Sequence, residues 1–347
     1  MRSGVVSVIL PCYNAGDYVS IAVQSILDQT YQDLEILAID DGSTDATLER
    51  LKSLAARDCR VRILENGANR GLIATLNRGL DEASGAFIAR MDADDRSHPG
   101  RIEAQVSALG RRDDCGVVGT QAVAVDGDGR ALRKMPLRCV EPAAAAFLSL
   151  FATPILHPTM LARSEVMSRY RYSTVASSLH TEDYELFARM IRGGVGFLNI
   201  AEVLYDYRIW PGRVSERFER EQVENFAVTA RAHLGEMLDV VLDASAHRAL
   251  INRMDRSCSP LALATALHQL DMLRRRFQAS VPTTGMGGDE VLRIADEQRL
   301  DILLQALLKG GFTQRTAASA LALRYLPRLL SAHSRRYLIG KLSRPAG

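Results

Sequence analysis

Three aspartates, Asp92, Asp94 and Asp95, lie within four positions of the stretch ARMDADDRSHP, directly after an apolar run. Two carboxylates separated by one residue at the end of a strand can hold one divalent cation, with water and phosphate oxygens as its other ligands. The same residues could instead form a solvated turn in which Asp95 caps the next helix. We favour the cation site, because other polar clusters are expected close to it.

Those clusters follow the other predicted strands. Four apolar or β-branched runs are predicted to be strands, at 5–10, 34–40, 61–64 and 86–92. Helical patterns lie between them, at 18–29, 45–57 and 73–83. This alternation predicts an α/β fold with an open, mostly parallel sheet flanked by helices. Ligands bind beyond the carboxyl ends of such strands, so PCYN, DDGSTD, NGANRG and DADD should line one edge.

The first two clusters contain groups that suit a nucleotide base. A carboxylate at the end of the second strand, Asp40 or Asp41, can accept a hydrogen bond from the imide N–H of uracil or thymine. Tyr13 could stack on a base, and Asn14 could shape the turn. A simple βα turn with good helix caps explains part of the same pattern.

A further acidic pair opens the predicted helix in LHTEDYELFARMIRGG. Carboxylates are favoured in the first turn of a helix by its dipole, so Thr181 and Asp183 could be capping residues. Alternatively, Asp183 is a general base that takes a proton from an attacking hydroxyl.

The composition narrows the class of protein. The chain of 347 residues has 43 Lys and Arg against 41 Asp and Glu, a net charge of +2, which does not indicate a nucleic-acid-binding protein. Its five scattered cysteines, without a CxxC pair, are typical of a reducing compartment. The apolar run before Pro11 is too short for a signal peptide, and the uncharged stretch around Pro154 is too short for a membrane span. We therefore predict a cytoplasmic protein.

The alternation of strands and helices does not continue along the whole chain. A hairpin is predicted at 117–133, closed by DGDG, and the body that holds the clusters is expected to cover 1–215. Residues 216–347 are predicted to be mainly helical, a region with a possible acceptor, partner or membrane role.

The end of the chain is basic. From Ile302 onward the sequence has eight Lys and Arg and no acid, and Arg324, Arg328 and Arg335 recur at helical spacing beside leucines. Such a basic amphipathic segment could lie on the anionic inner face of a membrane. It could equally be an ordinary helix packed on the acidic body. Both readings are open at this point.

Taken in order, several stretches resemble family 2 glycosyltransferases of the GT-A fold. They are VSVILPCYNAGDYVSIAVQSILDQTYQDLEILAIDDGSTDAT, NRG, ARMDADD, HPTM, EDYELFARM and YRI, and together they span residues 3–215. The resemblance implies a GT-A type sheet, a nucleoside diphosphate sugar donor, most simply UDP- or dTDP-linked, and a divalent cation, Mg²⁺ or Mn²⁺. It also implies inversion at the anomeric carbon.

The resemblance assigns roles to individual residues. Around the nucleotide sugar it places Pro11, Tyr13, Asn14, Asp40, Asp41, Arg70, Asp92 and Asp94. Asp94 would be the more direct metal ligand, with Asp92 contacting the ribose or water in the metal shell, and Asp183 would be the catalytic base. Further contacts with acceptor or diphosphate are expected from Asp95, His157, Glu182, Arg208, Trp210 and Arg213.

One position departs from the family pattern. Many members have YRxH at the point where this chain reads YRIWPGR, with Trp210 in place of the histidine. If that histidine helps to hold metal or diphosphate in relatives, Arg208 or Arg213 could supply the positive charge here.

The resemblance implies transfer of a sugar to a hydroxyl of a glycan or lipid-linked acceptor, in cell-surface polysaccharide synthesis. Nucleotidyl transfer would need a Gly-rich phosphate loop after the first strand, and PCYNAGDY lacks one. A dinucleotide oxidoreductase is disfavoured by the absence of GxGxxG there. A purely binding protein would have no need of Asp183 as a base.

Overall fold

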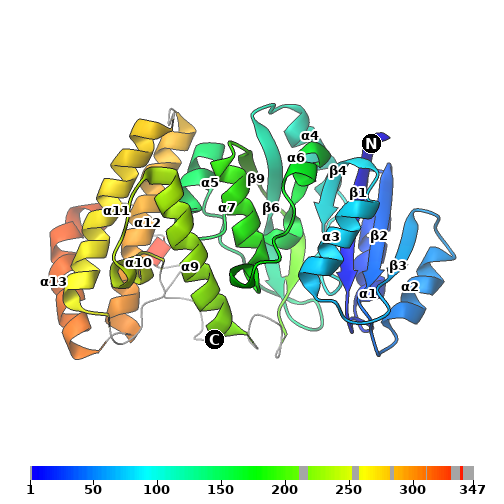
Figure 1. The fold of residues 1–347 in the computed structure, drawn as a ribbon, viewed down its shortest axis with the longest axis horizontal. Helices are drawn as coiled ribbons and strands as arrows, with labels where there is room; N and C mark the ends of the chain where they lie inside the picture. Colours follow the sequence, from blue (N-terminus) through cyan, green and yellow to red (C-terminus); the bar gives the residue numbers. More distant parts are fainter. Residues whose placement is uncertain are drawn as a thin grey trace. The chain divides into compact units, whose positions relative to one another are not determined.

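The structure is a computed structural model that describes residues 2–210, 218–251, 258–281, 285–309, 311–329 and 337–338 (Figure 1). It divides into two compact units. The first comprises Met1–Val140 and Thr153–Gln222, and the second Glu141–Ala152 and Val223–Gly347. The expected domain boundary at 215 lies outside the described residues.

The first unit contains a sheet in the order β3-β2-β1-β4-β8-β6-β9-β5. Its first four strands in this order are parallel, as the sequence predicts. They are β1 (Arg2–Cys12), β2 (Leu34–Asp40), β3 (Val61–Glu65) and β4 (Gly85–Arg90). Since they run the same way, the loops that follow them meet at one edge.

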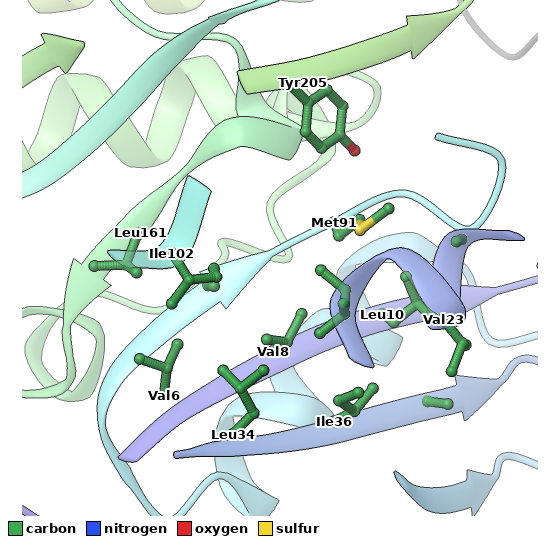
Figure 2. Close-up of a cluster of buried hydrophobic side chains, with 14 of the residues drawn as sticks. Val6, Val8, Leu10, Val23, Leu34, Ile36, Met91, Ile102, Leu161 and Tyr205 are labelled. Atoms are coloured by element: carbon green, nitrogen blue, oxygen red, sulfur yellow. The ribbon is translucent and has the colours of Figure 1, made fainter. Parts of the chain in front are cut away.

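Helices cover both faces of these strands. They are α1 (Val19–Leu27), α2 (Thr47–Ala55), α3 (Leu72–Glu82) and α4 (Arg101–Gly110). Val8 and Leu10 of β1 share one buried cluster with Val23 of α1 and Ile102 of α4 (Figure 2). Successive strand residues face opposite ways, so Ile9 faces α3, where the absence of a side chain on Gly79 allows close packing.

The other half of the sheet mixes directions. It contains β5 (Arg96–Ser97), β6 (Cys115–Val125), β7 (Ala131–Lys134), β8 (Leu161–Arg163) and β9 (Gly196–Arg208). Strand β9 runs parallel to β6, whereas β8 is antiparallel to both β4 and β6. The predicted hairpin is confirmed by β6 and β7, with Asp126 accepting the N–H groups of Asp128 and Arg130 in the turn.

Short helices complete the first unit. They are 3₁₀ turns at His157–Thr159 and Ala176–Ser178, α6 (Ser164–Arg169) and α7 (Glu182–Arg192). Helix α7 begins with the acids Glu182 and Asp183, as the sequence predicts.

The second unit is helical, as expected for the C-terminal part. It contains α5 (Pro142–Leu148), α10 (Ala244–Leu250), α11 (Pro260–Ser280), α12 (Met286–Lys309) and α13 (Phe312–Leu329), with most of α9 (Glu219–Leu238). Phe147 of α5 packs on Phe277 of α11, with ring centroids 5.2 Å apart. Among the described residues, the helices are too short or too polar to cross a bilayer. The side chains of Arg324, Arg328 and Arg335 lie outside the described part.

Candidate functional site

The loops after β1 and β2 are joined by hydrogen bonds. Asn14, which has a φ of 48°, donates its backbone N–H to Ser43 and accepts the N–H of Thr44. Asp45 accepts the N–H groups of Gly16 and Thr47, so it fixes the start of α2 as well as the first loop. Tyr13 is 51% exposed beside this junction, as a base-stacking ring would have to be.

Asp41 joins the loops after β2 and β3. Its carboxylate accepts hydrogen bonds from the side-chain amide of Asn66 at 2.6 Å and from the N–H groups of Arg70 and Gly71 at 2.9 and 3.0 Å. Asp40 is also buried and accepts the N–H of Ser43 with Oδ2. The polar clusters that follow the first three strands therefore lie together. Arg70 is exposed among them.

The DADD loop lies directly after β4. Oxygen atoms of Asp92, Asp94 and Asp95 all lie within 4.8 Å of one another. The N–H of Asp92 donates to the hydroxyl of Tyr205, which belongs to the same buried cluster as Met91 (Figure 2). Asp95 is buried and accepts the N–H of Arg208 at 2.7 Å. The alternative in which Asp95 caps the next helix is wrong, because α4 begins after Gly100 without a side-chain cap.

Arg90, the last residue of β4, is a site residue that the sequence reasoning missed. Its guanidinium binds both oxygens of Asp92, at 2.8 and 2.5 Å, and is 5% exposed. Burial lowers the pKa of Arg90, but the charge of Asp92, the nearby Tyr172 and Tyr205 and the hydrogen bond to Asp92 together outweigh burial, so the net shift of the pKa is upward. A charged residue in the apolar run AFIAR was the available signal, since a buried charge needs a partner.

The end of β9 is tied to the same loop. Arg208 is buried, and its guanidinium donates to the carbonyl oxygens of Asp94, Asp126 and Gly127. The indole N–H of Trp210 donates to Oδ2 of Asp94 at 2.9 Å. Two of the expected contact residues thus lie at the DADD loop, whereas Arg213 lies outside the described residues.

Asp183 and Glu182 lie close enough to Asp92 for their charges to interact with it. Burial raises the pKa of Asp183, although the N–H of Tyr184 and the charge of Arg90 oppose this. Burial and then the charge of Asp183 raise the pKa of Glu182 to about 7. Thr181 is the N-cap residue of α7 by position, but its hydroxyl donates to the carbonyl oxygen of Ser177 and accepts no N–H group from the first turn of the helix.

His157 lies against Tyr172, on which the charges of Glu182 and Asp183 act. It is buried, and its Nε2 lies 2.7 Å from the hydroxyl of Tyr172. Burial, followed by the nearby charge of Arg90, holds the pKa of His157 well below its usual range. The imidazole is therefore neutral at pH 7.

The site as a whole is rich in carboxylates that resist ionisation. Burial, then the charges of neighbouring acids, raises the pKa of Asp95 well above its usual range, and Asp92 is shifted in the same direction despite Arg90. A divalent cation among these oxygens would relieve the repulsion, and oxygen donors suit Mg²⁺ or Mn²⁺.

The family profile described as "Glycosyl transferase family 2" matches residues 7–169 of this chain. An uncharacterized glycosyltransferase of Haemophilus influenzae is 34% identical over 251 residues, which cover 68% of this chain and 75% of that protein. The chain belongs to glycosyltransferase family 2. It is thus a glycosyltransferase.

Two further likenesses agree with this membership. The O-antigen biosynthesis glycosyltransferase WbnJ of Escherichia coli is 31% identical over 211 residues, 59% of this chain and 79% of WbnJ. The fold matches that of Staphylococcus aureus TarS, residues 1–349, solved with UDP-GlcNAc. There the TM-score is 0.56 at 17% sequence identity, and the match covers 92% of each chain. The GT-A fold expected from the sequence is confirmed.

Proposed function

We propose that this glycosyltransferase moves a sugar from a nucleoside diphosphate donor, UDP- or dTDP-linked, to a hydroxyl of a glycan or lipid-linked acceptor, with inversion. One observation carries the proposal. The loops after β1, β2 and β3 are held together by the hydrogen bonds of Asn14 and Asp41, and Asp183 lies within electrostatic reach of Asp92 in the loop after β4. These are the groups that a donor and an attacking hydroxyl would need in one place.

The donor's base would bind between the first three loops. Tyr13 offers an exposed ring for stacking, with Pro11 and Asn14 beside it, and Arg70 is exposed for contact with base or diphosphate. Asp40 and Asp41 supply the carboxylates of this region. Asp41 also holds the loop that carries Arg70, so its substitution would disturb both the base and the diphosphate contacts.

The cation would be held chiefly by Asp94. Arg90 already binds both oxygens of Asp92, which suits Asp92 better for ribose or for water in the metal shell. The fit rests on the cluster of acidic oxygens and on the raised pKa values of Asp92 and Asp95, which a cation would lower again. When bound, a divalent cation stabilises the negative charge of the leaving diphosphate as a Lewis acid.

Asp183 is the proposed base. Its carboxylate takes the proton of the acceptor hydroxyl while the oxygen of that hydroxyl attacks the anomeric carbon and the bond to the diphosphate breaks. One displacement of this kind inverts the anomeric configuration. Arg90 is the nearby positive charge that favours the ionised form of Asp183. Glu182 and Trp210 remain proposed contacts of the acceptor or diphosphate.

The acceptor side is proposed from relatives. WbnJ is named for O-antigen biosynthesis, which supports a role in cell-surface polysaccharide synthesis for this chain. Since such synthesis uses nucleotide sugars, we infer a cytoplasmic enzyme, at the inner membrane face if the acceptor is lipid-linked.

The metal requirement can be tested directly. We expect EDTA to abolish transfer and Mn²⁺ or Mg²⁺ to restore it, because the leaving diphosphate loses its counter-charge without a cation. The measurement is release of nucleoside diphosphate, with Asp94→Asn as a variant that the cations should fail to restore. Full activity in the chelator would contradict the metal part of the proposal.

A further inference from the structure

The side chain of Trp210 is partly exposed and forms a hydrogen bond with a carboxylate of the DADD loop. It is 37% exposed, and its indole Nε1 lies 2.9 Å from Oδ2 of Asp94. The residue two positions earlier, Arg208, donates its backbone N–H to Asp95 and its guanidinium Nε to the carbonyl oxygen of Asp94. The end of β9 therefore holds Asp94 by both its backbone and its side chain.

The oxygens of the DADD loop are not equally available. Arg90 occupies both oxygens of Asp92, and the N–H of Arg208 occupies Oδ1 of Asp95, whose Oδ2 is buried away from solvent. Trp210 occupies Oδ2 of Asp94. Within the described residues, Oδ1 of Asp94 has no such donor, and Asp94 is only partly buried.

We propose that Trp210 is a positioning residue for the cation: its indole N–H holds Oδ2 of Asp94, so that Asp94 presents Oδ1 as a single ligand. The inference rests on the proposed metal-dependent function. A hydrogen bond to a ligating carboxylate fixes its orientation, and loss of such a partner typically weakens metal binding 10- to 100-fold. The remaining positions around the cation are then left for water and diphosphate oxygens.

The chain contains one tryptophan, so its intrinsic fluorescence reports on this position alone. Mn²⁺ is paramagnetic and quenches a nearby indole, whereas Mg²⁺ does not. We expect Mn²⁺, added with UDP to the full chain, to quench the emission in a saturable way, and Mg²⁺ to compete with it. Asp94→Asn should remove the quenching, and Glu49→Gln, an exposed acid in α2, should leave it unchanged.

A second measurement tests the hydrogen bond from the indole N–H of Trp210 separately from the aromatic ring. Trp210→Phe keeps an aromatic ring but lacks the donor, and we expect it to bind Mn²⁺ about tenfold more weakly, followed by the electron paramagnetic resonance signal of free Mn²⁺. Trp210→His restores a ring N–H and should bind Mn²⁺ at least as tightly as the parent. Thermal unfolding of both variants, expected to match the parent, separates this effect from a loss of folding.

These measurements distinguish failure of the role given to Trp210 from failure of the proposed metal site. Equal Mn²⁺ affinity of the parent and Trp210→Phe, or binding without any quenching, would overturn the role of Trp210 while the metal site stands. If the parent binds no Mn²⁺, the inference and the metal part of the function fail together. Transfer activity in EDTA then shows whether the sugar transfer itself survives.

Discussion

At the scale of single residues, the proposed base works where its charge is disfavoured. Burial raises the pKa of Asp183, and the positive charge of Arg90 limits this rise. Arg90 is itself fixed by its two contacts with Asp92. The buried ion pair between Arg90 and Asp92 therefore links the DADD loop to the ionisation of Asp183. Both cation binding and proton removal from the acceptor depend on this pair.

This arrangement predicts a pH dependence. A base must be ionised, so transfer is lost as the pH falls through the pKa of Asp183. Because that pKa is raised, the loss should begin at a higher pH than for an ordinary aspartate, whose pKa is ~4. The measurement is kcat/KM between pH 4.5 and 8.5, with donor binding followed in parallel by calorimetry. A rate that stays constant down to pH 4.5 would remove Asp183 from this role.

Residue types and spacing could predict the acids of the site but not their partners. Asp92 and Asp94 follow from their place after a strand, whereas Asp183 at a helix start could have been a capping residue, and the family resemblance was needed to assign it as the base. The pairing of Arg90 with Asp92 depends on a side-chain direction that the sequence does not specify. His157 was expected to be a contact of acceptor or diphosphate, and it lies buried against Tyr172.

At the scale of elements, the strand ends are tied by turns that need particular backbones. Gly42 follows the Asp40–Asp41 pair with a φ of +72°, and a Cβ there would lie 2.5 Å from the backbone carbon of Ala68. The DDG turn can therefore approach the NGANRG loop closely only with glycine at this position. This approach brings Asp41 within hydrogen-bond distance of the N–H groups of Arg70 and Gly71.

Gly42→Ala should accordingly be costly. The left-handed backbone alone costs about 1–2 kcal/mol, and the contact with Ala68 adds to it, so we expect unfolding free energy to fall by at least ~2 kcal/mol. Urea denaturation measures this, and nucleotide affinity should fall as the loops separate. Gly100→Ala is the matched control, since a Cβ at Gly100 meets open space and its φ is −86°. Equal stability of the two variants would contradict the role given to Gly42.

Periodicity predicted the longer elements and not the shortest. Strands β1 to β4 and the helices between them follow from apolar spacing, and the hairpin follows from its DGDG turn. Strands β5 and β8 have two and three residues, too few for any period to appear. Helix α5 belongs to the second unit although it precedes much of the first unit in the sequence. Its Phe147 packs against Phe277, 130 positions later, and no local pattern in the sequence predicts that contact.

At the scale of the whole molecule, the basic end of the chain is the proposed link to a membrane. From Ile302 onward there are eight Lys and Arg and no acid. Each such charge near an anionic surface contributes roughly 1 kcal/mol, and salt screens the attraction. The enzyme would then be held at the membrane that contains a lipid-linked acceptor.

Replacing Arg324, Arg328 and Arg335 together by Gln tests this link while keeping the length of the chain. We expect the triple variant to lose most of its sedimentation with anionic vesicles, and neither protein to bind neutral vesicles. Transfer to a soluble acceptor should be unchanged. If the variant sediments as well as the parent, the segment is not the membrane contact, and an ordinary packed helix becomes the better account.

The central claim is base-assisted sugar transfer from a nucleotide sugar, and one measurement tests it most directly. The parent and Asp183→Asn are each incubated with Mn²⁺ and a panel of nucleoside diphosphate sugars with glycan acceptors, and release of nucleoside diphosphate is followed. We predict that the parent turns over at least one donor, and that Asp183→Asn binds the same donor but transfers its sugar ~10²–10⁴ times more slowly. Turnover of that donor by Asp183→Asn at the parent's rate would contradict the account.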